Sequence, residues 1–109
     1  MKAKVKTVDV NALEWFDKVN GNSYFAGTVT VNYGMKTEKR FIMPYQYGYG
    51  SQYESEAMDV LINSGCAPDA EKYNNGGKES IWQYCRRRGI IYRHSKQENC
   101  KLRELKNIK

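Results

Sequence analysis

Apolar and polar residues alternate through the first half of the chain with the two-residue period of β-strands. Val8 and Val10 share one face of the first alternating segment. Asn20-Gly21 follows, a strong hairpin signal because both central residues of a type I′ turn need a positive φ. Residues 11–19 fit either a short helix or a continuation of the strand. We therefore predict a first strand and a hairpin that turns at Asn20-Gly21.

The alternation continues after this turn and predicts two further strands. In the second strand the apolar face is interrupted by Gly27, which predicts a bulge or a close approach of two backbones. The third strand covers residues 40–49, and Pro44 places it at a sheet edge or at a bend. We expect one face of the second strand to hold Phe25, Val29, Val31 and Tyr33. One face of the third should hold Phe41, Met43, Tyr45, Tyr47 and Tyr49.

Helical spacing of apolar residues replaces the alternation in the second half. Ser51 and Glu54 form a capping-box pattern that opens a helix ending at Gly65. A second helix is predicted over residues 78–88, and residues 90–92 read as a short strand. From Ser95 onward, the spacing predicts a C-terminal amphipathic helix with its apolar residues at Leu102, Leu105 and Ile108.

These elements predict one α+β domain over residues 1–109, with a small antiparallel sheet of three to four strands and two to three helices packed on one face. A hydrophobic content of 40% argues against disorder. No apolar run approaches the roughly 18 residues of a membrane span, and the basic N-terminus leads into no apolar signal region. Three cysteines without such a signal favour reduced thiols and a cytoplasmic location.

Positive charge is concentrated toward the C-terminal end of the chain. Residues 86–109 hold nine Lys and Arg against two Glu, whereas residues 41–71 hold five acids and no base. A basic surface suits a polyanion such as a nucleic-acid backbone. Cations at a helix C-terminus are also favoured by the helix dipole alone, so both interpretations stay open. The candidate nucleic-acid-binding residues are Arg86, Arg87, Arg88, Arg93 and Lys96.

Tyrosines gather where the basic residues are missing. Tyrosine combines a large contact area with a polar tip, which is why it is concentrated in protein interfaces. The alternative is that these rings form the rim of the core face begun by Phe41 and Met43. The candidate partner-binding residues are Tyr45, Tyr47, Tyr49 and Tyr53.

Catalytic and metal-binding patterns are weak. The single histidine is His94, and any histidine-dependent mechanism would have to use it. Cys85, His94 and Cys100 lack the close cysteine pair of a zinc site. The carboxylates Glu54 and Glu56 lie in a first helical turn, where the dipole favours them. We therefore expect no enzyme activity, no cofactor and no metal.

The segment from Trp15 to Phe25, WFDKVNGNSYF, resembles small proteins encoded by bacteriophages and prophages. In these an aromatic pair precedes a Gly-Asn-Ser/Thr-Tyr turn and a valine-rich strand, and the later Tyr47-Gly48-Tyr49-Gly50 is similar in character. The resemblance implies a phage or mobile element acting in a bacterial cytoplasm. Small proteins in that setting bind nucleic acid or block a host defence complex such as a CRISPR effector.

We accordingly expect a non-enzymatic binding protein that docks on a host nucleoprotein defence complex and inhibits it, as anti-CRISPR proteins do. The alternative is direct binding of DNA or RNA through the basic C-terminal segment. An edge strand that contains Pro44 could also pair with a second copy of the chain, which would give a homodimer.

Overall fold

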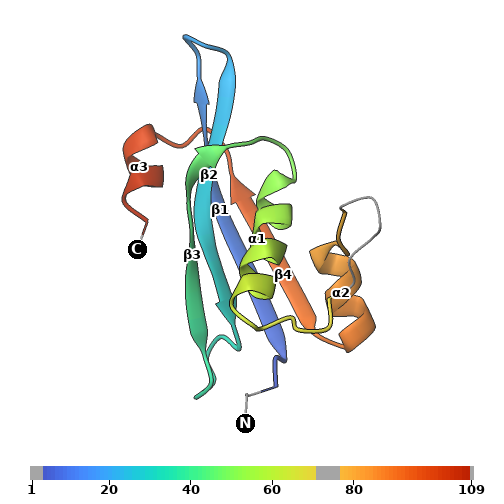
Figure 1. Ribbon diagram of the computed structural model, residues 1–109. Helices are drawn as coiled ribbons and strands as arrows, with labels where there is room; N and C mark the ends of the chain where they lie inside the picture. The colour runs from blue at the N-terminus through green and yellow to red at the C-terminus, as the bar shows by residue number, and fades with distance from the viewer. Residues whose placement is uncertain (1–3, 71–76, 109) are drawn as a thin grey trace.

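The computed structural model describes residues 4–70 and 77–108, which fold into a four-stranded sheet with three helices (Figure 1). This confirms the α+β class. In chain order the elements are β1 (Thr7–Asp17), β2 (Asn22–Val31), β3 (Lys39–Tyr47), α1 (Gln52–Asn63), α2 (Ile81–Arg88), β4 (Ile91–Gln97) and α3 (Leu102–Lys106).

The strand order across the sheet is β3-β2-β1-β4. The β1–β2 and β2–β3 pairs are antiparallel, as expected, but β4 runs parallel to β1 and makes the sheet mixed. The reason is the long connection after β3, in which α1 and α2 carry the chain across one face of the sheet to its far edge (Figure 1). This crossover is right-handed, as the twist of β-strands favours.

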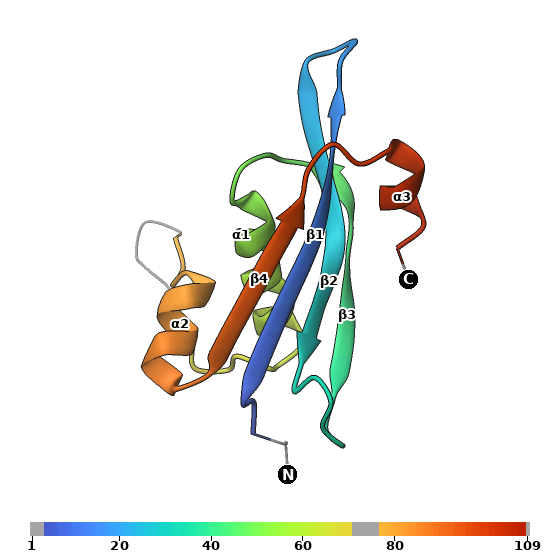
Figure 2. The ribbon, with the colours of Figure 1, turned by 180° about the vertical axis from the view of Figure 1, so that it is seen from behind.

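The two faces of the sheet are covered by different helices. The front face, defined as the one under α1 and α2, holds the main core, in which Val10, Val29 and Met43 pack with Met58 and Leu61. On the opposite, back face, α3 places Leu105 beside Ala26 and Cys100 (Figure 2). The expected placement of helices on one face therefore applies to α1 and α2, while α3 covers part of the back.

The β1–β2 hairpin forms where the sequence predicts it, with a longer turn. Residues 11–17 continue β1, so the helical alternative for this segment is wrong. The Gly21 N–H donates to the Asp17 carbonyl at 2.8 Å, and Gly21 has φ 71°. Asn20 does not have a positive φ, so the predicted two-residue type I′ turn is wrong. Instead, the Asp17 carboxylate accepts the backbone N–H groups of Val19 and Asn20 and stabilises a four-residue loop.

β3 contains a β-bulge that divides its aromatic residues between the two faces. Met43 pairs with Gly27 and Gln46 pairs with Phe25, so Pro44 and Tyr45 together oppose one residue of β2. Phe41 and Met43 consequently face the front, while Tyr45 and Tyr47 face the back, and the single face predicted for them is wrong. β3 is an edge strand, as Pro44 indicated. Tyr33 lies beyond the end of β2 and is exposed, so it does not share the face of Phe25.

Helix caps and the end of the chain also differ from the prediction. Ser51 makes no side-chain capping bond at α1, whereas Ser80 and Gln83 form a complete capping box at α2. Ser95 lies within β4 rather than starting a helix, because residues 91–97 all pair with β1. The expected close approach at Gly27 is confirmed, since a Cβ there would overlap the carbonyl oxygen of Asn11.

Candidate binding surfaces

A ladder of aromatic rings crosses β1, β2 and β3 on the back face. Trp15 stacks on Tyr24 with ring centroids 5.6 Å apart, and Tyr24 stacks on Tyr45 at 5.2 Å. Tyr47 meets Tyr24 edge-on at 5.8 Å. The ammonium of Lys106 lies 5.6 Å from the centre of the Tyr45 ring and fixes α3 to the ladder. Cross-strand register brings these rings together, because Trp15 pairs with Tyr24 and Tyr24 with Tyr47.

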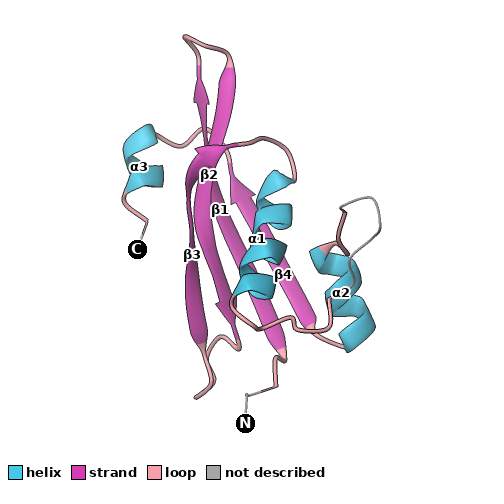
Figure 3. Ribbon diagram, in the orientation of Figure 1, coloured by secondary structure: helices cyan, strands magenta, loops and turns pink. Residues whose placement is uncertain are grey.

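Beside this ladder, apolar and aromatic side chains remain exposed around the end of the β1–β2 hairpin. Tyr47 is 57% exposed and Tyr49 is 64% exposed. The hairpin extends past all the helices drawn, so no helix covers its end (Figure 3). Phe16 is 47% exposed but follows Trp15 in β1, so its ring lies on the front side of the hairpin, away from the ladder. We define the hairpin-end surface as Trp15, Val19, Tyr24, Tyr45, Tyr47 and Tyr49.

Three of the four tyrosines proposed for partner binding belong to this surface, and Tyr53 does not. Tyr53 is 6% exposed and lies in the front core, with its hydroxyl 2.9 Å from Nδ1 of His94. Burial raises the pKa of the Tyr53 phenol, with a further contribution from the charge of Glu54. The proposal of Tyr53 as a contact residue is therefore wrong. The prediction did not select Trp15, although an aromatic residue shortly before a hairpin signal could have indicated it.

Most of the cations proposed for nucleic-acid binding are engaged with carboxylates of the same molecule. The Arg88 Nε lies 3.1 Å from Asp69, and Lys96 lies 2.9 Å from Glu14. Arg93 donates two hydrogen bonds to Asp9, at 2.7 and 3.0 Å, which raise the pKa of its guanidinium.

Arg87 forms a comparable two-bond contact with Glu79. The remaining residue of the five, Arg86, is exposed and has no carboxylate partner in the described part of the chain. Phosphate contact through the other four would have to displace these ion pairs.

His94 belongs to a hydrogen-bonded group that connects α1 to β4. The Tyr92 hydroxyl donates to Glu54 Oε1 at 2.6 Å, and the His94 ring stacks on Tyr92 with centroids 5.0 Å apart. Desolvation and the Glu54 carboxylate raise the pKa of Tyr92. These contacts give His94 a structural role between Tyr53 and Tyr92.

Two of the three cysteines, Cys85 and Cys100, have the environment of structural thiols. Cys85 is buried in the front core, and desolvation raises the pKa of its thiol to about 11. Burial also raises the pKa of Cys100. A thiol with a raised pKa carries little of the reactive thiolate near neutral pH. Among the described residues, no three potential metal-ligating side chains gather at one place.

The chain matches no protein-family model, no curated protein and no solved structure. Within residues 4–70 and 77–108, no helix has the length and apolar content to cross a bilayer.

Proposed function

We propose that this protein is a non-catalytic binding protein that docks on a protein partner through the hairpin-end surface. The observation that carries the proposal is the exposure of Tyr47 and Tyr49 beside the stacked ladder of Trp15, Tyr24 and Tyr45. Exposed aromatic groups of this kind are typical of protein interfaces. Because the ladder holds its rings in place before binding, little conformational entropy is lost when a partner covers them.

The partner class follows from the resemblance of residues 15–25 to phage-encoded proteins. In that setting the partner is a host nucleoprotein defence complex, and the small protein inhibits the complex by covering one of its working surfaces. Direct nucleic-acid binding by the C-terminal cations is the weaker alternative, because four of the five proposed residues already contact carboxylates.

Affinity capture from bacterial lysate, with and without nuclease, tests this proposal. The wild-type protein should retain a host protein complex after nuclease treatment, and Tyr47→Ala combined with Tyr49→Ala should lose it. Tyr33→Ala is the matched control, because Tyr33 is 67% exposed but lies beyond the far end of β2.

If Tyr33→Ala also lost the complex, this would contradict the proposal that the hairpin-end surface is the specific binding site. Capture that disappears with nuclease and weakens in Arg86→Ala would favour the nucleic-acid alternative.

A further inference from the structure

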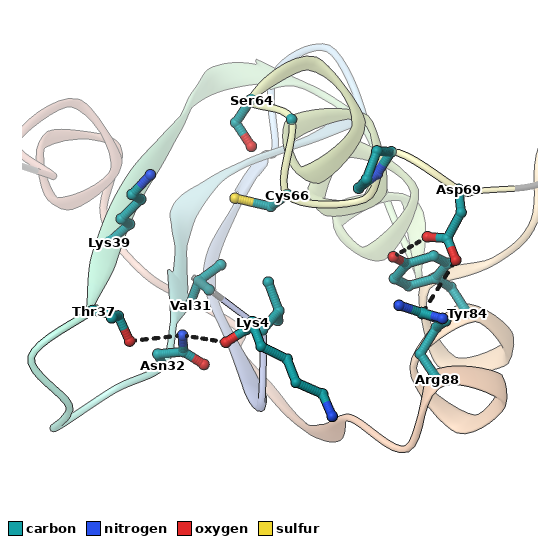
Figure 4. Close-up of a pocket in the computed structure, with 13 residues that line it drawn as sticks. Lys4, Val31, Asn32, Thr37, Lys39, Ser64, Cys66, Asp69, Tyr84 and Arg88 are labelled. Carbon is teal, nitrogen blue, oxygen red and sulfur yellow. Dashed lines mark hydrogen bonds and ion pairs between the residues drawn. The ribbon is translucent and has the colours of Figure 1, made fainter. Parts of the chain in front are cut away.

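A second surface feature lies at the end of the molecule opposite the hairpin. There an open hollow of about 340 Å³ is bordered by residues just before β1, the β2–β3 loop, the loop after α1 and the last turn of α2 (Figure 4). This volume lies at the lower end of the roughly 300–1,000 Å³ found for small-molecule sites. We call this feature the basic hollow; its rim and floor include Lys4, Lys39, Arg88, Val31, Ser64 and Cys66.

The charges around the basic hollow favour an anion. Lys4, Lys39 and Arg88 lie at three separate places along its rim, and Figure 4 shows the two lysine side chains extending away from one another. In the described part of the chain, no carboxylate lies within ion-pair distance of the Lys4 or Lys39 ammonium group. Asp69 is the one acid among the lining residues described, so three cations face a single carboxylate.

The negative charge of the Asp69 carboxylate is already compensated by its contacts with Tyr84 and Arg88. Asp69 accepts a 2.7 Å hydrogen bond from the Tyr84 hydroxyl and lies 3.1 Å from Arg88 Nε. The Tyr84 hydrogen bond is the main cause of a lowered pKa for Asp69, which therefore stays ionised and bound to these donors. Arg88 contacts it through Nε, so this guanidinium already compensates the carboxylate.

The backbone that carries the lysines is held in place by Asn32. Asn32 is 1% exposed, and its amide donates to the Lys4 carbonyl and to Thr37 Oγ1, each at 3.0 Å. Its carbonyl oxygen accepts the Lys6 N–H at 2.7 Å. One buried side chain thus joins the segment of Lys4 to the loop that precedes Lys39. The backbone that carries the two lysines is therefore organised without a ligand, which lowers the entropic cost of binding.

We propose that the basic hollow binds the phosphate group of a phosphate ester. The flexible side chains of the two lysines supply charge-assisted hydrogen bonds to phosphate oxygens, and the Arg88 guanidinium adds positive charge at the rim. The floor, formed in part by Val31 and Cys66, takes the organic group attached to the phosphate. The ester is either a free mononucleotide-sized molecule or part of a nucleic acid. This site lies far from the hairpin-end surface and does not depend on it.

Titration of the ¹⁵N-labelled protein with phenyl phosphate tests the site by amide chemical shifts. The amides of Val5, Asn32 and Cys66 should move saturably, and benzyl alcohol, which has no phosphate, should move them at least about tenfold more weakly. The Lys4→Ala, Lys39→Ala double variant should also bind phenyl phosphate at least about tenfold more weakly, as expected when two charge-assisted contacts are lost.

The matched control is the double variant Lys18→Ala, Lys101→Ala, which removes two exposed lysines that do not line the hollow. Its affinity should stay within about twofold of wild type. Lys39→Gln keeps most of the side-chain stem and should also weaken binding, which covers the case in which the alanine variant folds poorly. The absence of saturable shifts, equal affinity for benzyl alcohol or unchanged affinity in the lysine variants would each overturn the proposal.

The source of the phosphate is distinguished with single-stranded oligonucleotides. If the site takes a terminal or free phosphate ester, an oligonucleotide with a 5′-phosphate should shift the same three amides and its unphosphorylated counterpart should not. If the site takes the phosphodiester backbone, both oligonucleotides should bind equally, with an affinity that falls steeply as salt is added. Both results support a phosphate-ester site and separate its two sources.

Discussion

The guanidinium of Arg87 holds the buried carboxylate of Glu79 with two hydrogen bonds, from Nε to Oε2 at 3.0 Å and from Nη2 to Oε1 at 2.9 Å. Glu79 is 4% exposed, and the Arg87 guanidinium also lies over the ring of Tyr84. A buried carboxylate is tolerated only when it is paired in this way. Arg87 therefore stabilises the junction between α2 and the segment before it.

Replacing Arg87 should destabilise the fold strongly. Arg87→Ala leaves the Glu79 carboxylate buried without its main partner, and we expect the free energy of unfolding to fall by about 3 kcal/mol. Arg86→Ala is the matched control on the same helix and should change it by less than about 0.5 kcal/mol. Urea unfolding of both variants measures the difference. Similar small effects in the two variants would contradict the structural role of Arg87.

Asn32 should be equally sensitive, because its side chain joins the segment of Lys4 to Thr37 in the β2–β3 loop. Asn32→Ala removes four hydrogen bonds. It also places alanine at φ 56°, a backbone conformation that asparagine adopts more readily. We therefore expect the free energy of unfolding to fall by about 3 kcal/mol. Asn32→Gly tolerates the backbone conformation but also lacks the bonds, and it should lose about 2 kcal/mol. Recovery of wild-type stability in the glycine variant would show that only the backbone conformation matters.

The close approach of β1 and β2 requires glycine at position 27. In Gly27→Ala the new methyl group meets the Asn11 carbonyl and the Ala12 backbone, so the strands must separate, at a cost of about 3 kcal/mol. Gly34→Ala is the comparison: it has open space around it but φ 78°, and should cost about 1 kcal/mol. Thermal unfolding, monitored by circular dichroism, measures which variant loses more stability. A larger loss in Gly34→Ala than in Gly27→Ala would contradict the close contact.

Tyr84 should make stability depend on pH in the alkaline range. Burial, followed by the hydrogen bond to Asp69, raises the pKa of Tyr84 to about 12, whereas a tyrosine in the unfolded chain ionises near 10. Its contribution to stability is complete below about pH 10 and is lost as the pH rises toward 12, because the unfolded state releases the proton first. Tyr84→Phe should therefore show a shallower fall in unfolding free energy over this interval. An identical slope in wild type and variant would contradict the assignment.

Local patterns predicted where the strands and helices lie better than they predicted which strands pair with one another. Alternation located β1, β2 and β3, and Pro44 indicated the irregular position in β3. A period of two could not show that the bulge at Pro44 and Tyr45 moves the later tyrosines to the other face. β4 was underestimated because most of its side chains are exposed, which leaves no periodic apolar signal. Its pairing with β1 joins residues 84 positions apart, and no local pattern encodes such a contact.

The environments of the candidate binding residues were predicted in part, for the same reason. Tyr47 and Tyr49 are exposed, as a contact surface requires. Tyr53 precedes Ala57 by one helical turn and Leu61 by two, so helical spacing already placed it on the buried stripe of α1. The ion pairs of Arg88 with Asp69 and of Arg93 with Asp9 depend on tertiary contacts, which charge counting along the chain cannot show.

β1 is an interior strand whose two neighbours become available at very different stages of synthesis. β2 follows it directly, but β4 starts at Ile91, so a nascent chain that has not yet reached this residue leaves one edge of β1 without hydrogen-bond partners. The hairpin can form early on the ribosome, whereas closure of the sheet waits for nearly the whole domain. Fragments that stop before β4 should therefore aggregate through that open edge, and the domain should unfold as a single cooperative unit.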